Sequence, residues 1–238
     1  MAKTGCPTVG QLVAERPARS KVFERHGIDF CCGGKLPLDE ACAKRKLNLQ
    51  TILNELELSD RAPSPGKDWQ KASLTELCDH IEAKHHKYIR EELPALSELV
   101  QKVVSVHGRN HRELAKVGEL FVGVRAEIES HMLKEEQILF PICRQLDAED
   151  SPVACHCGSV ANPIRVMEME HDAVGSAMHT IRVLTGNYTL PPDGCNSYRA
   201  MLARLTQFED DLHEHIHKEN NILFPRAIAR EQRLAVGT

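Results

Sequence analysis

The segment His131-Met-Leu-Lys-Glu-Glu-Gln-Ile-Leu-Phe-Pro141 occurs a second time, in altered form, as His215-Ile-His-Lys-Glu-Asn-Asn-Ile-Leu-Phe-Pro225. In both copies a histidine precedes a glutamate by four residues, as His131 precedes Glu135. Residues with this spacing lie on one face of a helix, about 5–6 Å apart. Each pair can therefore hold one metal centre.

The repeat extends beyond these segments. His86 lies 45 residues before His131, and His171 lies 44 residues before His215. Two half-sites of the form His...His-x3-Glu result, and their histidines and carboxylates are expected to converge on two metal ions, with the glutamates able to bridge. The candidate metal ligands are His86, His131, Glu135, His171, His215 and Glu219.

Apolar residues place these ligands inside a helical bundle. Val124, Ile128 and Ile138 share one helical stripe with His131 and Glu135, and the second copy shows the same pattern. Long amphipathic helices are expected at about 73–105, 110–146, 160–186 and 195–230. The sequence therefore predicts an all-α protein built on a four-helix bundle.

A smaller helical domain is expected in front of the bundle. Residues 8–25 and 38–57 are each expected to form a short amphipathic helix, and residues 61–68, which contain two prolines and a glycine, are expected to form a linker. The predicted domains are 1–62 and 72–232. Pro141 and Pro225 each follow the glutamate of the repeat by six residues, and they are expected to mark matched helix ends.

Composition limits the class of protein. The 238 residues carry a formal net charge of -4 with acidic and basic residues interspersed, so a nucleic-acid partner is not expected. No signal-peptide core and no membrane span are recognisable, so a cytoplasmic protein is expected. Nine cysteines form an odd number, which argues against a fully paired disulfide framework. Thirteen histidines are many for this length and favour metal binding.

Mixed imidazole and carboxylate ligation favours two iron ions bridged by carboxylates. Structural zinc is less favoured, because it prefers four ligands closed around one ion. Residue types alone leave dimanganese open. The alternative without a metal is a bundle whose core histidines and glutamates repeat incidentally, which would leave buried carboxylates without a cation.

Several neighbouring residues are open to two interpretations. Spacing and the downstream apolar face favour His86 over the adjacent His85 as a ligand. Glu127, Glu170 and Asp211 are expected to orient imidazoles or relay protons, or else to form a partly solvated helix flank. His213 and His217 point away from His215 on a helix, and they are expected to be solvated, with a second, adventitious metal site as the alternative.

The chain resembles the RIC family, the repair-of-iron-centres proteins, which join an N-terminal domain of the ScdA type to a hemerythrin-like four-helix bundle. Residues 29–35, Asp-Phe-Cys-Cys-Gly-Gly-Lys, match the N-terminal signature, and residues 130–141 and 219–226 match the bundle motifs. The resemblance implies that the six candidate ligands hold the metals. It also places His86 in the ligand role, since Arg90-Glu91 and Leu93-Pro94 set the register.

The resemblance implies protection or repair of iron–sulfur clusters after damage by nitric oxide or oxidants, with damaged iron–sulfur proteins as clients. Nitric oxide or dioxygen would bind at the di-iron centre, where nitric oxide reduction to nitrous oxide is conceivable chemically because two metals lie side by side. The alternative function is non-catalytic: oxygen or nitric oxide binding, or iron storage, as in hemerythrin-like proteins. A homodimer is left open.

Cys31 and Cys32 are the second functional candidates. With Gly33 and Gly34 they are expected to lie in an exposed turn near a helix start, which lowers a thiol pKa. The family carries this pair, which implies a role in nitric oxide transfer, iron delivery or redox contact with the client. The alternative is a tight turn whose cysteines only pack.

Two other groups are expected to be solvated loops. Cys155-His156-Cys157 lies between the two halves of the repeat and is not part of the family pattern. Three near-adjacent ligands without a partner motif are a weak metal signal. His107 and His111 lie in a similar polar turn.

Overall fold

The structure is a computed structural model that describes residues 6–61, 67–151 and 157–236. Within these ranges every regular element is helical, and an isolated β-bridge joins Thr8 to Pro37. The all-α prediction is thereby confirmed. The chain divides into two compact units: an amino-terminal unit, Met1–Leu77 with Leu146–Val153 and His213–Thr238, and a bundle unit, Cys78–Gln145 with Ala154–Leu212.

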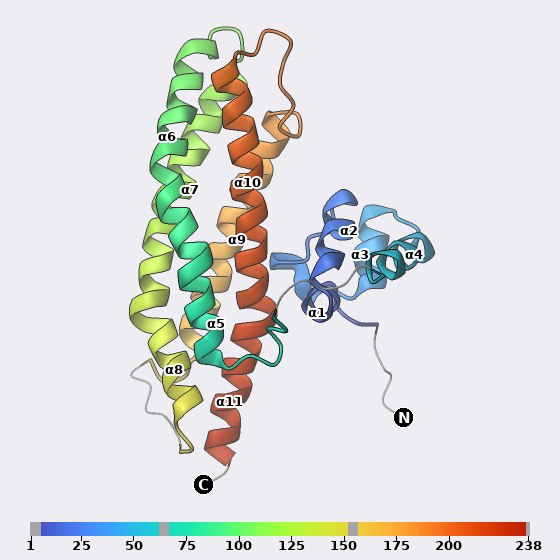
Figure 1. Cartoon of the computed structure of the whole chain (residues 1–238), viewed down its shortest axis with the longest axis vertical. Helices are drawn as coiled ribbons and strands as arrows, with labels where there is room; N and C mark the ends of the chain where they lie inside the picture. The colour runs from blue at the N-terminus through green and yellow to red at the C-terminus, as the bar shows by residue number, and fades with distance from the viewer. Residues whose placement is uncertain (1–5, 62–66, 152–156, 237–238) are drawn as a thin grey trace. The chain divides into compact units, whose positions relative to one another are not determined.

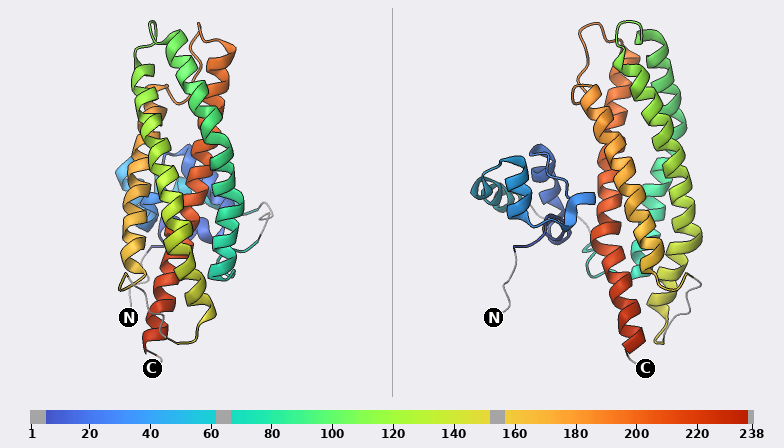
Figure 2. Two further views of the ribbon diagram at one scale, coloured as in Figure 1. Left: turned by 90° about the vertical axis from the view of Figure 1, so that its left-hand side faces the viewer. Right: turned by 180° about the vertical axis from the view of Figure 1, so that it is seen from behind.

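Four long helices form the bundle unit and lie side by side in Figures 1 and 2, alternating in direction. They are α6 (Lys87–His107), α7 (Glu113–Lys134), α9 (Ala161–Leu184) and α10, which begins at Asn196 and continues to Lys218. The shorter elements along the same rods are α5 (Leu74–His80), η3 (Ile81–His86), η4 (Glu135–Leu139), α8 (Phe140–Ala148), η5 (Glu219–Leu223) and α11 (Phe224–Val236). These bounds confirm the four predicted long helices.

The core of the bundle unit follows helical periodicity. On α7, Val117, Phe121, Val124 and Ile128 lie three or four residues apart, and all four are buried. Phe121 meets Phe208 of α10 edge to face, with 5.9 Å between the ring centroids. Residues with this spacing form one continuous apolar stripe, and the stripe leads along α7 to His131.

The prediction that Pro141 and Pro225 mark helix ends is wrong. Both prolines lie near the start of a helix that continues, α8 and α11 respectively, and each follows a π-helical segment. There the Phe140 N–H donates to the Glu135 carbonyl, five residues back, and the Phe224 N–H donates to Glu219 in the same way. The extra residue in the turn shifts the hydrogen-bond register where proline supplies no N–H, so the helix continues.

Residues 9–59 of the amino-terminal unit form six short helical elements where two longer helices were expected. They are α1 (Val9–Glu15), η1 (Pro17–Arg19), α2 (Ser20–Arg25), η2 (Cys32–Lys35), α3 (Leu38–Arg45) and α4 (Leu49–Ser59). Their apolar faces enclose Phe23, which is fully buried. Ile216 of the same unit joins this core.

Local signals explain why each expected helix is split. Pro17 holds Arg16 in an extended conformation, with φ -141° and ψ 93°, as proline does to the residue before it. Lys46 has a left-handed conformation with φ 57°, which ends α3. Asn48 then caps α4 by accepting a hydrogen bond from the Thr51 N–H at 3.1 Å.

The predicted linker lies largely outside the described residues, because 62–66 fall in a gap. Among the helices that are described, none is both long enough and apolar enough to cross a membrane.

Candidate metal centre

Three π-helical segments carry metal-ligand candidates at their ends. His86 is the last residue of η3, Glu135 is the first of η4, and Glu219 is the first of η5. The other candidates lie within regular helices: His131 on α7, His171 on α9 and His215 on α10. π-helical turns are rare and occur often at functional sites. Here η4 and η5 lie within the two copies of the proline-containing repeat.

All six candidate ligands are buried. Glu135, Glu219 and His86 are 0% exposed, and the other three histidines are at most 4% exposed. Removing a carboxylate from water is costly unless a cation or hydrogen bonds compensate. Two fully buried carboxylates surrounded by imidazoles therefore fit a cation-binding centre.

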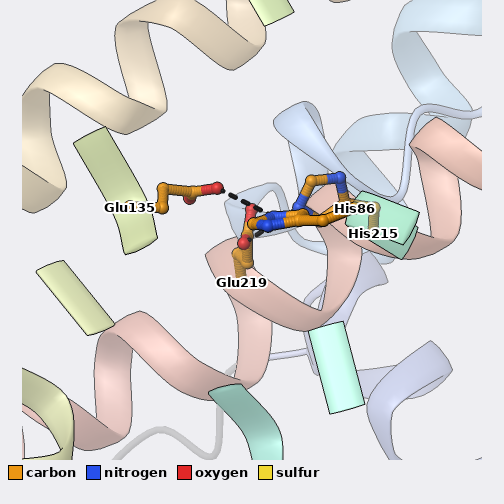
Figure 3. Close-up of side chains that lie close together, drawn as sticks. All are labelled: His86, Glu135, His215 and Glu219. Carbon is orange, nitrogen blue, oxygen red and sulfur yellow. Dashed lines mark hydrogen bonds and ion pairs between the residues drawn. The ribbon is translucent and has the colours of Figure 1, made fainter. Parts of the chain in front are cut away.

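The ligand atoms form two overlapping groups, and the atoms within each group all lie within 4.8 Å of one another. The first group is His86, Glu135, His215 and Glu219; the second is His131, Glu135, His171 and Glu219. Figure 3 shows the first group, in which the two carboxylates and the two imidazoles converge. Glu135 and Glu219 belong to both groups, as bridging carboxylates would.

The oxygens of Glu135 face two different histidines. Oε2 lies 3.3 Å from His86 Nε2, and Oε1 lies 3.3 Å from His131 Nε2. Oε1 of Glu219 lies 3.0 Å from His215 Nε2. A carboxylate that presents one oxygen to each end of a site can link two cations.

The second group also has the spacing of metal ligands. Nε2 of His131 and Nε2 of His171 lie 3.0 Å apart. Metal–nitrogen bonds of about 2 Å place two adjacent ligand atoms roughly 3 Å apart, so both nitrogens can reach one ion. The donor set and this spacing fit a di-metal site.

Each His-x3-Glu pair of the repeat lies within one group, as its spacing predicted, but the upstream histidine of each group comes from the other half of the repeat. His131 shares its group with His171 from the other half, and His86 shares its group with His215. Each group thus takes one histidine from each half of the repeat. Spacing along one helix cannot reveal this exchange, because it depends on which helices meet.

Outer carboxylates contact two of the imidazoles. His86 Nδ1 donates to Glu136 Oε1 at 2.7 Å, and His131 Nδ1 donates to Glu170 Oε2 at 2.9 Å. When the ring is neutral, a donating Nδ1 leaves the lone pair on Nε2, the nitrogen that faces the candidate centre. Arg90 binds Glu136, and Lys134 binds Glu170.

The same contacts lower the pKa of both outer carboxyl groups. Burial alone would raise the pKa of Glu136, but its bonds to Arg90 and His86 outweigh that effect and lower it. Burial acts likewise on Glu170, whose pKa is nevertheless lowered by Lys134 and His131. Both groups are therefore held in the ionised form that accepts an imidazole N–H.

Of the predicted outer carboxylates Glu170 and Glu127, one contacts a ligand imidazole and the other does not. Glu170 lies beside an imidazole, although that of His131 rather than its neighbour His171. Glu127 is half-buried, and no hydrogen bond or ion pair within the described ranges involves its side chain. The sequence did not predict that Glu136 contacts His86. The one signal that could have indicated this role was its position next to Glu135.

Asp211 accepts a hydrogen bond from His85, not from His215 as its position in the repeat suggested. His85 Nδ1 lies 2.9 Å from Asp211 Oδ1. His85 and His86 are both fully buried, so burial does not separate them. Their partners do, because His85 faces this carboxylate while His86 Nε2 faces Glu135.

The expectation of an exposed turn for Cys31 is wrong. Cys31 is 5% exposed and Cys32 is half-buried at the start of η2. A hydrogen bond with Cys32, then burial, raises the pKa of Cys31 well above its ordinary value. Cys31 also donates its thiol hydrogen to Asp29 Oδ1 at 3.2 Å. This thiol is therefore protonated and sheltered at neutral pH.

His217 is buried rather than solvated, and His213 is half-buried. His217 packs against Phe30 with 5.6 Å between ring centroids, and burial lowers the pKa of His217 to about 4. The prediction that these two residues are solvated is therefore wrong. The reason is that their helix also faces the core of the amino-terminal unit.

Of the two predicted solvated loops, the turn with His107 and His111 is fully described and the loop with Cys155 only in part. His111 is paired with Asp193 at 2.9 Å, and His107 lies 3.1 Å from Cys195 Sγ. Cys155 and His156 lie outside the described residues, so the interpretation of that loop stays a prediction.

The fold and the paired ligand groups define a hemerythrin-like four-helix protein with a buried His/Glu di-metal site. The family model described as "Hemerythrin HHE cation binding domain" matches residues 79–227. A second model, ScdA_N, described as "Domain of Unknown function (DUF542)", matches residues 6–60. Together these matches span both parts of the chain.

Relatives match nearly the whole chain. The "Probable iron-sulfur cluster repair protein" of Haemophilus influenzae is 40% identical over 224 residues, which cover 92% of this chain and 96% of the relative. The "Iron-sulfur cluster repair protein YtfE" of Edwardsiella ictaluri is 40% identical over 223 residues, with the same coverage. The YtfE protein of Citrobacter koseri is 40% identical over 225 residues, covering 94% and 97%. The chain belongs to the YtfE/ScdA-type family of iron–sulfur cluster repair proteins.

Proposed function

We propose that this chain is a non-haem di-iron protein that repairs iron–sulfur clusters damaged by nitric oxide or oxidants. The observation that carries the proposal is the pair of overlapping ligand groups that share Glu135 and Glu219. The chain also matches, along almost its full length, relatives that are named as iron–sulfur cluster repair proteins.

The proposed cofactor is two iron ions bridged by the two shared carboxylates. One ion would be held by His86 and His215, and the other by His131 and His171. This donor set has four imidazoles and two carboxylates but no thiolate. It therefore favours two separate iron ions over an iron–sulfur cluster and over a structural zinc ion. When bound, the ions would supply redox chemistry and open coordination positions for a diatomic molecule such as nitric oxide or dioxygen.

The protein's own residues prepare the centre for these ions. Glu136 and Glu170 accept the Nδ1 hydrogens of His86 and His131, which fixes the orientation of both rings. Burial of all six ligands excludes bulk water and strengthens electrostatic interactions inside the site. We infer that Glu170 also relays protons, because its carboxylate accepts the Nδ1 hydrogen of His131.

The proposed organisation is a cysteine-bearing domain, residues 1–62, followed by the di-iron bundle, residues 72–232. Matches of the two family models to residues 6–60 and 79–227 support this division. The amino-terminal domain supports repair over simple gas binding or iron storage, since a bundle alone would suffice for either. We place the reaction in the cytoplasm, with damaged iron–sulfur proteins as clients that meet the Cys31-Cys32 turn.

One experiment tests the cofactor and the function separately. The full chain is loaded with Fe²⁺ without oxygen, its iron content is measured, and it is incubated with a nitric oxide-damaged [4Fe–4S] dehydratase. The expected result is two irons per chain and recovery of dehydratase activity beyond that given by the same amount of free Fe²⁺. Nitrous oxide is measured in parallel after nitric oxide is added to the reduced protein.

Each outcome has a distinct meaning. Fewer than two irons per fully loaded chain would contradict the di-iron assignment. Two irons with no recovery of the dehydratase would contradict repair and favour the alternative, a gas-binding or iron-storage protein. Recovery without nitrous oxide would support repair by iron donation and rule out nitric oxide reductase activity.

A further inference from the structure

Asp29, Cys31 and Cys32 form a second group of metal-ligating atoms, separate in residues from the imidazole–carboxylate centre. A carboxylate oxygen of Asp29 and the two sulfurs all lie within 4.8 Å of one another. Neither cysteine forms a disulfide. A vicinal dithiol beside a carboxylate has the donor chemistry of a soft or borderline divalent cation rather than that of Mg²⁺ or Ca²⁺.

The turn itself holds these donors together. Asp29 Oδ1 accepts hydrogen bonds from the Cys31 N–H at 3.0 Å and from the Cys31 thiol at 3.2 Å. A Cβ atom on Gly33 would lie 3.2 Å from both Cγ and Oδ2 of Asp29, a tight contact. Glycine at position 33 thus leaves room for the carboxylate to lie over the turn, next to the sulfurs.

A side chain from another part of the amino-terminal unit fixes the backbone of the turn. Asn221 Nδ2 donates to the Phe30 carbonyl at 3.3 Å and to the Cys31 carbonyl at 3.1 Å. Asn221 also packs so closely on Gly34 that a Cβ there would lie 2.3 Å from Asn221 Oδ1. The donors are therefore held by a rigid support, which lowers the cost of ordering them around an ion.

The state of Cys31 fits a metal ligand better than a nucleophile. Its hydrogen bond to Cys32 and its burial raise its pKa well above the ordinary value, and a reactive cysteine needs the opposite shift. A cation, in contrast, displaces the proton of a thiol that it binds. Binding of one divalent ion by both thiols would release two protons to solvent.

We propose that Asp29, Cys31 and Cys32 form an exchangeable site for one soft or borderline divalent cation such as Zn²⁺ or Fe²⁺. Three protein donors leave the coordination shell open, whereas structural zinc sites close it with four. Asp29 is exposed, so an ion can enter and leave from solvent. Such a site suits reversible binding or hand-over of an ion and does not depend on the assignment of iron to the bundle.

Cadmium provides a direct probe, because its bonds to thiolate absorb in the ultraviolet while its bonds to imidazole and carboxylate do not. The reduced, iron-loaded full chain is titrated with Cd²⁺ alone, and thiolate–cadmium absorption and released protons are measured. Variants are Cys32→Ser, Cys31→Ser and Asp29→Asn. Cys6→Ser and Cys195→Ser are matched controls, since both are exposed free thiols elsewhere.

The expected result is one absorbing Cd²⁺ and two protons released per chain, unchanged in both control variants. Either cysteine variant should lose the signal. Asp29→Asn, an exposed and isosteric change that leaves the fold intact, should weaken binding by roughly tenfold or more. Unchanged binding in Asp29→Asn, or absorption that persists in Cys32→Ser, would overturn the proposal.

A variant that lacks the bundle's metals tests whether the thiolate site binds cadmium independently of the bundle. In Glu135→Gln/Glu219→Gln, which is designed to lose the bundle's metals, cadmium–thiolate absorption is expected to persist with the same affinity. Loss of that absorption in a variant that remains folded by circular dichroism would contradict an independent thiolate site. Failure of the repair function would leave this outcome unchanged.

Discussion

The Nε2 atoms of His131 and His171 lie 3.0 Å apart on two different helices, α7 and α9. Both side chains are almost fully buried, and at this distance one ring can donate a hydrogen bond to the other. The same spacing lets both nitrogens present their lone pairs to one cation. The pair therefore links the fold of the bundle directly to metal binding.

Removal of a shared carboxylate is expected to disable both halves of the centre. Glu219→Gln keeps the size of the side chain but removes the charge that offsets two cations, so iron content should fall from two per chain to below one. Glu129→Gln on α7 is the matched control, because Glu129 is exposed and pairs with Arg125 at 2.9 Å. Iron analysis after anaerobic loading measures both. Equal iron contents would contradict the bridging role.

Loss of an outer carboxylate is expected to weaken metal binding without abolishing it. Glu170→Gln removes the anion that fixes the tautomer and orientation of His131, and such outer partners typically contribute roughly 10–100-fold in metal affinity. Competition with a chelator measures the change. Glu127→Gln is the control, since that half-buried residue is not bonded to a candidate ligand in the described structure. An equal loss in both variants would indicate a general effect on the helix.

Cys195 is expected to react as a thiolate at neutral pH. A hydrogen bond from His107, assisted by the Tyr198 backbone, lowers its pKa from 9.0 to about 7. Because a lowered pKa favours the deprotonated form, the alkylation rate should rise as the pH passes about 7. His107→Ala should move this midpoint upward, while His111→Ala should not. Mass spectrometry of the Cys195 peptide measures the rate, and an unchanged midpoint in His107→Ala would contradict the pairing.

Gly34 and Asn221 are expected to be energetically coupled. Gly34→Ala places a Cβ 2.3 Å from the present position of Asn221 Oδ1, and such overpacking typically costs about 1–3 kcal/mol of unfolding free energy. Adding Asn221→Ala should restore part of that loss, because it removes the clashing atoms. Urea unfolding of the two single variants and the double variant measures the coupling. Strictly additive effects would show that the contact does not limit stability.

The edge-to-face contact of Phe121 and Phe208 anchors the bundle unit. Phe121→Ala should lower the unfolding free energy by about 3–5 kcal/mol, because it leaves a cavity in a closely packed core. Val122→Ala is the adjacent control, since Val122 is 56% exposed, and it should change stability by about 0.5 kcal/mol or less. Denaturant unfolding distinguishes the two. Similar effects would contradict the placement of Phe121 in the core.

Helical periodicity was sufficient to predict the long helices and the ligand candidates. His131 and Glu135 lie four residues apart on an apolar stripe, and that relationship is local, so it can be read without tertiary structure. The same local reasoning failed at Pro141. It treated proline as a helix end, whereas the π-helical segment η4 absorbs the missing N–H and the helix continues.

The residues near Cys31 show a second feature that local sequence patterns could not predict. The Cys-Cys-Gly-Gly pattern indicated a tight turn, but exposure depends on what covers the turn. Phe30 and Cys31 are buried, and Asn221, 190 residues further along the chain than Cys31, holds their carbonyls. A contact of that separation leaves no periodic signal in one sequence.

By itself, the sequence determined the all-α class, the amphipathic rods and the six candidate ligands, because helix period and ligand spacing are properties of neighbouring residues. Only the tertiary structure decided that His131 meets His171 and that His86 meets His215. It also decided that Glu136 supports His86, and that Asp211 pairs with His85. The physical reason is that these partners come from different helices, and packing of those helices, not distance along the chain, brings their side chains within bonding range.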